Sequence, residues 1–521
     1  MAHNPSSGTA VLDTTDPASF TDPALRTVYD EVPYENHPYR KSHPDALATV
    51  GRLFGLDPTP VERARVLELG GGDGSNIIPI AALYPDSSCV GIDLSPQAIG
   101  KGLQTIKSLR LSNVLLRQLS ITDAGAELGT FDYIICHGIY SWVGPEVRQR
   151  ILQICKQNLN PNGIAYVSYN CMPGWHFRGL ARELMRFHGA KYQEPKLFVH
   201  QARAIMKFIA ENATERDPVY RTVLAREEKT IQQCPDWHLY HDYLERYNDP
   251  VYFADFAALA ANAGLQYLGD SEVAKLVPQE FSPEVQQMLG RFSTDIVQLE
   301  QYMDFLRNRM FRRTLLVHDS VHISRELNPE RIEHFSIACP MKKSSRPGEL
   351  DRYAHPNGGA LQGGVPILNR AVEALIDVFP RALSFDVLFD AAIARLGDST
   401  RLDAQRSALK AGLMKLFLAE LCDFRTVNPP IAEKVEPNPK ALAYTRQQAT
   451  SEGFVTNLLH DPVSPTPIQR AVLAQCDGTK ALADVVAAVK SIKPQLLPPQ
   501  LVEPEVRNAL AYLHGAALLL S

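Results

Sequence analysis

Residues 66–76 read VLELGGGDGSN, an apolar run that ends in a cluster of glycines. The apolar run predicts a buried strand, and the glycines predict a tight turn that leads into a helix. Because glycine has no Cβ atom, the backbone at Gly70 and Gly72 can approach a bound ligand closely. The free N–H groups at the start of the helix would face the same ligand. The stretch therefore indicates a nucleotide-binding turn in an α/β fold.

The spacing of the glycines distinguishes two kinds of nucleotide site. A dinucleotide site needs the pattern GxGxxG, whose third glycine would fall where this chain has Ser75. The pattern GxGxG fits instead, through Gly70, Gly72 and Gly74. Glu68, just before the turn, would repel a pyrophosphate but attract the cationic methionine part of S-adenosylmethionine. The turn therefore predicts S-adenosylmethionine as the cofactor, bound by residues that include Glu68, Gly70 and Gly72.

The ends of the next two predicted strands supply further candidates for this cofactor site. Asp93 follows the glycine turn at the distance where a carboxylate can accept both hydroxyls of a ribose. Leu94 adjoins it and is assigned to the same site. Ser120 stands where an Asp commonly receives the adenine amino group, so a hydroxyl or backbone groups would hold the adenine here. Ile121 would pack on the adenine ring.

Strand and helix patterns alternate outward from the turn over residues 65–170, which is typical of a parallel sheet covered on both faces. The predicted strands are 65–69, 88–93, 114–121, 132–137 and 164–170. The predicted helices are 75–83, 96–110 and 145–158. We therefore expect an α/β fold of the class I S-adenosylmethionine methyltransferase type, Rossmann-like, with a doubly wound, mostly parallel sheet.

The chain continues beyond this sheet with a different pattern. Helical periodicity dominates residues 178–235, which we interpret as a helical insertion. Residues 253–273 predict a helix stopped by Gly264 and then a strand, and a helix over 297–313 leads into a strand over 314–318. These two strands would complete the sheet, so the core would close near residue 325.

Proline and glycine punctuate the last third of the chain. Three stretches are interpreted as linkers or long loops, namely 344–366, 428–440 and 493–504. The expected order is a mobile tail (1–28), a cofactor-binding core (29–177), the helical insertion (178–235), the remainder of the core with a regulatory-type segment (236–325), a middle, mainly helical domain (326–430) and a C-terminal, mainly helical domain (431–521).

The composition bounds the classes of function. A chain of 521 residues is too long for one core, and about 150 residues per domain suggests several domains. The net charge of −5 provides no basic surface, so we expect no nucleic-acid partner. One basic run, which we interpret as solvent-exposed charge, comprises Arg307, Arg309, Arg312 and Arg313.

Cysteine spacing and hydropathy exclude further classes. The eight cysteines are scattered without metal-ligand spacing, so we expect neither a metal nor a disulfide framework. No apolar run approaches the ~18 residues of a membrane span, and the first residues lack the pattern of an export signal. We therefore expect a cytoplasmic protein without membrane insertion.

Aromatic and polar residues follow the fourth and fifth predicted strands, where the methyl acceptor should lie. In an open α/β sheet the ligand lies beyond the carboxyl ends of the strands. Aromatic rings lower the pKa of a nearby lysine by desolvating it, and they attract cations. Tyr140, Trp142, Asn170 and Trp175 are therefore the candidate catalytic residues, against the alternative that the tryptophans only pack the domain edge. His137 is assigned to the cofactor or to packing rather than to a role as base.

Four stretches resemble the bacterial methyltransferases that carry a methyltransferase regulatory domain. They are YDEVPYENHPYRKSHPDALATVGRLFG (29–55), the glycine turn, FDYIICHGIYSWV (131–143) and VSYNCMPGWHFRG (167–179). This family includes the rickettsial-type protein lysine methyltransferases that act on outer-membrane proteins. The resemblance implies a class I core with an inserted helical dimerisation element, hence a homodimer, followed by a middle and a C-terminal domain. It also implies an N-terminal lid of Tyr29, Tyr34 and His37, in which Tyr34 would contact the cofactor.

Three functions remain open at this point. The leading one is a protein lysine N-methyltransferase, with an unfolded or nascent outer-membrane protein as partner, because the extra domains offer more surface than a small acceptor needs. The second is a small-molecule methyltransferase of a biosynthetic or cell-envelope pathway, in which the extra domains mediate assembly. The third is a cofactor-binding regulator without turnover, which the presence of both cofactor and acceptor residues disfavours.

Overall fold

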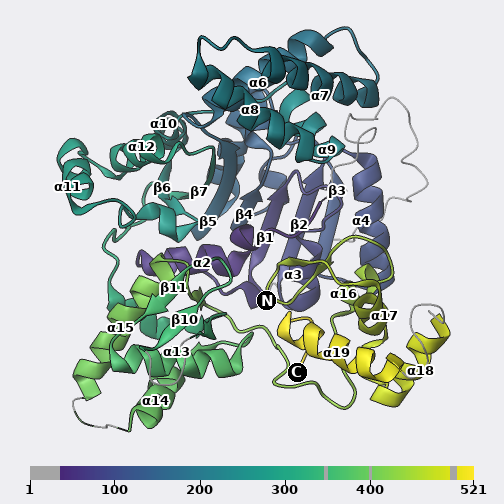
Figure 1. Ribbon diagram of the computed structural model, residues 1–521, viewed down its shortest axis with the longest axis vertical. Helices are drawn as coiled ribbons and strands as arrows, with labels where there is room; N and C mark the ends of the chain where they lie inside the picture. The colour runs from purple at the N-terminus through teal and green to yellow at the C-terminus, as the bar shows by residue number, and fades with distance from the viewer. Residues whose placement is uncertain (1–35, 345–349, 398–399, 401, 493–500) are drawn as a thin grey trace, which may run out of the picture.

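The computed structural model describes residues 36–344, 350–397, 400, 402–492 and 501–521. Seven of the described strands form one sheet in the order β3-β2-β1-β4-β5-β7-β6 (Figure 1). They are β1 (Arg65–Leu69), β2 (Ser88–Asp93), β3 (Val114–Gln118), β4 (Phe131–Cys136), β5 (Leu159–Asn170), β6 (Leu265–Asp270) and β7 (Phe311–His318). β7 runs antiparallel to β5 and β6, whereas β1 to β5 are parallel. The predicted Rossmann-like, mostly parallel sheet is therefore present.

Helices of the core flank this sheet, and local signals define their ends. They are α2 (Pro44–Leu53), α3 (Ile78–Leu83), α4 (Pro96–Leu109), α5 (Pro145–Asn158), α10 (Phe253–Asn262), α11 (Pro283–Phe292) and α12 (Ile296–Arg307). The hydroxyl of Ser95 accepts the N–H of Ala98 and caps α4. α12 ends where Asn308 adopts the left-handed conformation, with φ of 48°.

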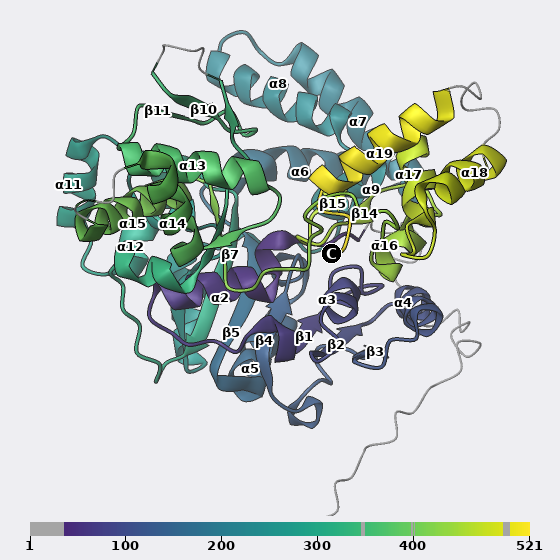
Figure 2. The same ribbon diagram turned by 90° about the horizontal axis from the view of Figure 1, so that it is seen from below.

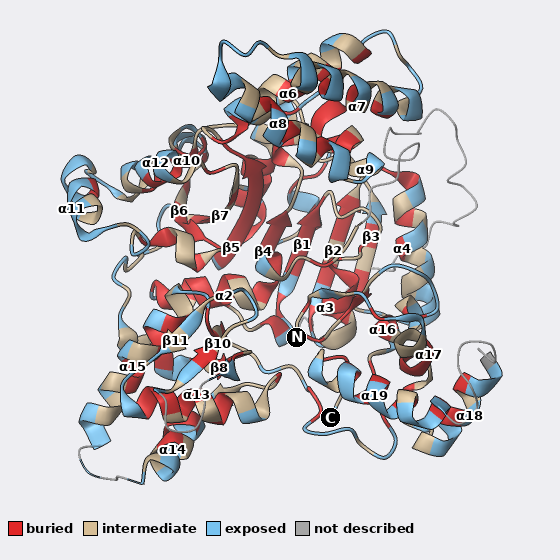
Figure 3. Cartoon of the chain, in the orientation of Figure 1, coloured by how far each residue is buried: buried red, intermediate tan, exposed pale blue. Residues whose placement is uncertain are grey.

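Successive side chains of the central strands pack into two different cores. Val66 and Tyr133 are buried on the face covered by α2 and α3. Leu67 and Ile134 are buried on the face covered by α5 and α10. Figure 3 shows the resulting burial along the central strands. Because side chains alternate between the two faces of a strand, Glu68 lies on the same face as Val66.

The observed elements differ from the predicted ones mainly at their ends. β3 ends at Gln118, and the chain then turns at Ser120, whose carbonyl accepts the N–H of Asp123 at 3.0 Å. α3 begins at Ile78, because Gly74, with φ of +78°, still belongs to the turn. The two strands predicted from 253–273 and 314–318 are β6 and β7.

The prediction that the basic run is solvent-exposed is wrong for Arg309 and Arg312, which are buried. Arg309 Nη2 donates to Asp270 Oδ2 at 2.6 Å. Arg312 donates through Nε to Asp304 Oδ2 at 2.7 Å and through Nη1 to Glu300 Oε2 at 2.9 Å. These acids lie on β6 and α12, so only the packing of α12 on the sheet brings the opposite charges together.

The helical insertion has a core of its own. Its helices are α6 (Trp175–Gly189), α7 (Pro195–Asn212), α8 (Pro218–Gln233) and α9 (Asp236–Leu239). The buried residues of this core include Met185, Met206 and Ile231, one from each of the three long helices. The helical periodicity of this segment therefore reflects packing among its own helices.

The middle part of the chain combines helices with two small sheets. Its helices are α13 (Pro366–Val378), α14 (Phe385–Leu396) and α15 (Leu402–Leu418). One sheet has the order β12-β8-β13, with β8 (Ser336–Ala338), β12 (Leu383–Ser384) and β13 (Asp423–Arg425). The other has the order β11-β10-β9, with β9 (Lys342–Lys343), β10 (Arg352–Ala354) and β11 (Ala360–Gln362).

The interpretation of 344–366 as a linker or long loop is therefore wrong for the part of it that forms β10 and β11. β10 and β11 pair antiparallel across a turn that contains Asn357 and Gly358, and Gly358 has φ of +92°. Asn-Gly between two short strands is a hairpin signal, which the high glycine and proline content concealed. Tyr353 of β10 is buried and anchors the hairpin to the domain.

The C-terminal part is a bundle of helices with one small hairpin. Its elements are α16 (Ala443–Gln448), β14 (Val455–Thr456), β15 (Pro462–Val463), α17 (Pro467–Gln475), α18 (Leu482–Ile492) and α19 (Val502–Gly515). α19 thus begins inside the stretch 493–504 that was interpreted as a linker. Figure 2 shows α6 to α8, α13 to α15 and α16 to α19 on one side of the large sheet, with α5 on the other. None of the described helices is both long enough and apolar enough to cross a membrane.

Candidate active site

The glycine turn after β1 has a backbone that only glycine adopts easily. Gly70 and Gly72 have φ of +69° and +55°. The N–H groups of Gly70 and Gly71 donate to the carbonyl of Ile92, at 2.8 and 3.1 Å, and so tie the turn to the end of β2. A Cβ atom on Gly70 would come within 2.4 Å of Ile139 Cδ1, in the loop after β4. The turn therefore sits tightly between two strand ends.

Asp93, at the end of β2, holds both the turn and the following helix. Its Oδ2 accepts the N–H of Gly72 at 2.8 Å, and its Oδ1 accepts the N–H of Ser95 at 2.8 Å. A carboxylate at the end of the second strand is also at the position where ligand hydroxyls can be accepted. Leu94 beside it is 57% exposed.

Glu68 is a buried acid beneath the turn. One oxygen, Oε1, accepts Asn76 Nδ2 at 2.7 Å. Within the described part of the chain, no donor pairs with the other oxygen, Oε2. Burial raises the pKa of Glu68 to about 8, although the hydrogen bond from Asn76 acts in the opposite direction. A positive ligand at this place would stabilise the ionised form.

His137 follows β4 on the same face of the sheet as Glu68. Its Nδ1 lies 2.8 Å from the hydroxyl of Tyr166 and 3.2 Å from that of Ser168. Its ring is 3.7 Å, between centroids, from the ring of Tyr39. Burial, and secondarily the charge of Arg313, lowers the pKa of His137 to about 3. A group with so low a pKa is a poor base near neutral pH, so its position suits packing or cofactor contact.

Ser120 and Ile121 lie in the turn after β3, at the same edge of the sheet. The Oγ of Ser120 lies 2.7 Å from Thr122 Oγ1. Ile121 is partly buried against the core that contains Leu69 and Ile92. Both residues are thus held in place by their own turn, next to the end of β2.

The four candidate catalytic residues lie in one aromatic region but differ in exposure. Tyr140 is buried, with its ring 5.1 Å from that of Phe256. Trp175 is also buried, and its ring lies 6.5 Å from that of the half-buried Trp142 in an edge-to-face arrangement. Asn170 is buried, and its Nδ2 donates to Asn248 Oδ1 at 3.1 Å.

Three parts of the chain match known families. A methyltransferase domain matches residues 67–165, and a predicted methyltransferase regulatory domain matches residues 235–318. The C-terminal winged helix domain of PKMT matches residues 437–493. A relative in Rickettsia prowazekii is 32% identical over 474 residues, which cover 88% of this chain and 85% of the relative. A second relative in that organism is 41% identical over 228 residues, which cover 44% of this chain and 91% of the relative.

The solved structure of PKMT2 from Rickettsia typhi is similar throughout. Its TM-score is 0.85 at 30% identity, and the match covers 94% of this chain and 100% of that chain. The chain belongs to the bacterial class I methyltransferases that carry a regulatory domain. A further structure of the Rickettsia typhi protein is a complex with AdoHcy. The present methyltransferase depends on S-adenosylmethionine.

The residues at the turn of this methyltransferase fit that cofactor. Within the described residues, Oε2 of Glu68 is a buried acceptor without a donor, and a cationic ligand would offset the charge of the ionised carboxylate. Asp93 stands at the end of β2 with the acceptor capacity that a ribose needs, and Leu94 offers an exposed apolar surface. We propose that these residues bind the cofactor together with Gly70, Gly72, Ser120, Ile121 and His137. Tyr29 and Tyr34 lie outside the described residues, so the role proposed for Tyr34 stays a prediction.

Near the glycine turn lie further residues to which the sequence assigned no role. Asn36 lies over the turn, where a Cβ atom on Gly72 would come within 2.4 Å of its Nδ2. Tyr39 covers His137, and its N–H donates to Asn76 Oδ1 at 2.9 Å. Asn76 belongs to the opening motif, so its place after a buried acid was a usable signal. Asn36 and Tyr39 precede the motif by about one helix and one loop, and local periodicity does not reveal their position.

The affinity of this methyltransferase for S-adenosylmethionine is expected to rise with pH, by up to about tenfold per pH unit, until about pH 8. Below that pH most of the free protein carries Glu68 in its protonated form, because burial raises its pKa to about 8. The cationic cofactor favours the carboxylate, so binding releases the proton and becomes easier as the pH rises. Calorimetry in two buffers with different ionisation enthalpies measures both the affinity and the proton release.

Glu68→Gln is the control for this effect, because Gln keeps the size of the side chain and does not titrate. The amino group of the cofactor itself titrates near pH 8. The contribution of that amino group is the dependence of affinity on pH that remains in the Glu68→Gln variant. Identical pH profiles for the two proteins would contradict the contact between Glu68 and the cofactor.

Proposed function

We propose that this enzyme is a protein lysine N-methyltransferase, with outer-membrane proteins among its substrates. The observation that carries the proposal is the similarity to PKMT2 over the whole of that chain, including a C-terminal domain of the PKMT type. Similarity confined to the cofactor domain would support only methyl transfer. Similarity that extends through the insertion, middle and C-terminal domains supports the proposal that this enzyme and PKMT2 act on the same class of methyl acceptor.

The chemistry requires little beyond positioning and removal of one proton. When bound, S-adenosylmethionine supplies a methyl group on a positively charged sulfur. A lysine must lose its proton before it can attack, which costs about 4–5 kcal/mol at pH 7. A dry aromatic surface reduces that cost, because it destabilises the ammonium relative to the neutral amine. The protein then has to hold the amine in line and exclude water.

Trp142 is the member of the aromatic region that we place against the acceptor lysine, because it is half-buried and keeps surface for a ligand. Trp175 supports it edge to face, with ring centroids 6.5 Å apart. Tyr140 and Asn170 are buried, and we propose that they hold the ends of β4 and β5 in position around it. On this proposal the acceptor lysine lies at the carboxyl edge of the sheet.

The helical insertion exposes large apolar side chains. Phe187, Phe208 and Val219, on α6, α7 and α8, are 86%, 58% and 73% exposed. Such exposed apolar residues support the proposal that the insertion pairs with a second copy of this chain in a homodimer.

All eight cysteines are free thiols, and all except Cys234 are buried, which suits a reducing compartment such as the cytoplasm.

Incubation with isotope-labelled S-adenosylmethionine and urea-unfolded outer-membrane proteins is expected to transfer label to lysine side chains. Mass spectrometry of tryptic peptides locates the methyl groups. The matched substrate has its lysines blocked by acetylation, and it should accept no label. The Asp93→Ala variant of the enzyme is the second control and should transfer far less label at a cofactor concentration that half-saturates the wild type.

Two results would overturn the proposal. Label on the acetylated proteins, at residues other than lysine, would show a different acceptor atom. When a cell-envelope fraction replaces the purified proteins in the incubation, label found only in extractable small molecules would favour the alternative of a small-molecule methyltransferase.

A further inference from the structure

A hairpin loop of the C-terminal domain reaches the cofactor end of the sheet. The loop joins β14 to β15 and is closed by Asn457, whose Oδ1 accepts the N–H groups of Leu459 and Asp461 at 2.9 and 2.8 Å. Its backbone is also held from outside, because the N–H of Leu458 donates to the carbonyl of Ala517 at 2.9 Å. His460, near the tip, has φ of +63° and is buried. A residue in this conformation is held there by its surroundings.

The imidazole of His460 is hydrogen-bonded to the site. Its Nε2 lies 2.9 Å from Asn76 Oδ1, and Asn76 Nδ2 in turn donates to Glu68 Oε1 at 2.7 Å. The backbone N–H of Tyr39 also lies 2.9 Å from Asn76 Oδ1. A backbone N–H can only donate, so this contact fixes which end of the amide is the oxygen. His460 must therefore donate from Nε2, and Asn76 must present its NH₂ group to Glu68.

A second, aromatic connection runs in parallel. The ring of Phe454, just before β14, lies 5.7 Å from that of His37. His37 lies 4.3 Å from Tyr39, and Tyr39 lies 3.7 Å from His137. The segment from Asn36 to His43 is thus held between the C-terminal domain and the glycine turn.

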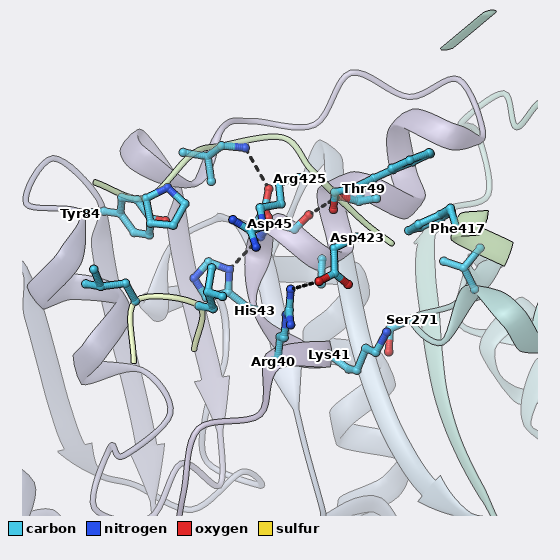
Figure 4. A pocket seen from close by; sticks show the side chains of 17 residues that line it. Arg40, Lys41, His43, Asp45, Thr49, Tyr84, Ser271, Phe417, Asp423 and Arg425 are labelled. Atoms are coloured by element: carbon cyan, nitrogen blue, oxygen red, sulfur yellow. Dashed lines mark hydrogen bonds and ion pairs between the residues drawn. The ribbon is translucent and has the colours of Figure 1, made fainter. Parts of the chain in front are cut away.

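Charges hold this junction together at its other end. Arg40 pairs with Asp423 of β13 at 2.8 Å and with Asp461 of the hairpin loop at 3.4 Å. Arg40, His43 and Asp423 line a cavity of about 70 Å³. The cavity lies between the N-terminal segment, the middle part of the chain and the hairpin loop of the C-terminal part (Figure 4). The ring of His43 lies 4.8 Å from that of His460. Burial lowers the pKa of His460 well below its usual range, in agreement with a neutral imidazole that donates one hydrogen bond.

We infer that His460 is a positioning residue for cofactor binding, acting through Asn76 on the carboxyl group of Glu68. With Oδ1 of Asn76 held by His460 and by the backbone of Tyr39, the amide cannot rotate away from Glu68. One oxygen of Glu68 is thereby bound, and the other is left toward the glycine turn, where a Cβ atom on Gly71 would lie 2.9 Å from it. The C-terminal domain is then part of the cofactor site. The inference rests on the role proposed for Glu68 and does not depend on the identity of the methyl acceptor.

Two replacements of His460 separate a hydrogen bond from mere packing. His460→Gln keeps an N–H donor at about the reach of Nε2, whereas His460→Asn is too short and yet tolerates a positive φ. We expect His460→Asn to weaken S-adenosylmethionine binding about five- to tenfold and to raise its KM by the same factor. The kcat at saturating cofactor should stay close to that of the wild type. His460→Gln should restore the affinity to within about twofold to threefold.

Asp461→Asn is the matched control, because it alters the same loop and its pair with Arg40 without touching Asn76. It should change the melting temperature more than the cofactor affinity. An equal loss of affinity in Asp461→Asn and His460→Asn would overturn the inference in favour of general docking of the domain. Wild-type affinity in His460→Asn would also overturn it. If His460→Asn does not fold, His460→Ser removes the same donor and takes its place.

A double-mutant cycle with Glu68→Gln tests the connection itself. If His460 acts through Glu68, its replacement should have little further effect on affinity in the Glu68→Gln background. Full additivity of the two losses would overturn the inference while leaving Glu68 as a cofactor residue. Unchanged affinity in Glu68→Gln alone would instead remove the role proposed for Glu68.

Discussion

Asp93→Ala is expected to lower the affinity for S-adenosylmethionine by at least about a hundredfold. The carboxylate would accept two ribose hydroxyls, and hydrogen bonds to charged groups contribute roughly 1.5–3 kcal/mol each. It also accepts the N–H groups of Gly72 and Ser95, both at 2.8 Å. Its removal therefore loosens the glycine turn in addition to deleting the ribose contact. Isothermal calorimetry of the purified full-length protein measures the change.

Asp93→Asn provides the graded control for this prediction. Asn keeps one acceptor oxygen and the shape of the side chain, but its NH₂ group cannot accept the N–H of Gly72. Its affinity should fall between those of the wild type and Asp93→Ala. A dissociation constant of Asp93→Ala within threefold of the wild-type value, with an unchanged melting temperature, would remove Asp93 from the cofactor site.

Arg312→Met is expected to destabilise the core by about 3–5 kcal/mol. Arg312 is fully buried, and it binds both oxygens of Asp304, at 2.7 and 2.9 Å, and Glu300 at 2.9 Å. Its guanidinium also lies 3.7 Å from the ring centroid of Phe253. Removal of the cation leaves two buried acids whose desolvation is no longer offset. Thermal unfolding should show the core transition at a temperature lower by roughly 6–20 °C.

The next residue along the chain supplies the control. Arg313 pairs with Glu272 at 2.8 Å, and both side chains are partly exposed. Arg313→Met should cost at most about 1 kcal/mol, because water screens such a pair. Addition of Glu300→Gln and Asp304→Asn to Arg312→Met should recover much of the lost stability. Equal melting temperatures for Arg312→Met and Arg313→Met would contradict the prediction.

Some features of the fold were predictable from the sequence and others were not. The strands around the glycine turn were predicted correctly, because buried parallel strands are continuous apolar runs with clear glycine and proline boundaries. The hairpin of β10 and β11 was missed, because a segment rich in proline and glycine resembles a linker by composition. The exposure predicted for Arg309 and Arg312 was wrong, because the acids that neutralise them lie on separate elements.

The candidate site divides in the same way. The turn, Glu68 and Asp93 were proposed from spacing, since each lies at or near the end of a strand that the sequence reveals. The different exposures of Trp142 and Trp175 became visible only when β4, β5 and the insertion were placed together.

By itself the sequence determined the fold class and the cofactor, and it supplied the two acids that we propose for the cofactor site. Those features depend on residues close together in the chain: a glycine that must adopt a positive φ, and an acid at the tip of a strand. Only the tertiary structure decided that Arg312 is buried and forms ion pairs with Glu300 and Asp304. Only the tertiary structure, likewise, brought His460 against Asn76, which is 384 positions away in the sequence. Such contacts arise when separately stable elements pack together, and no local pattern of residues encodes them.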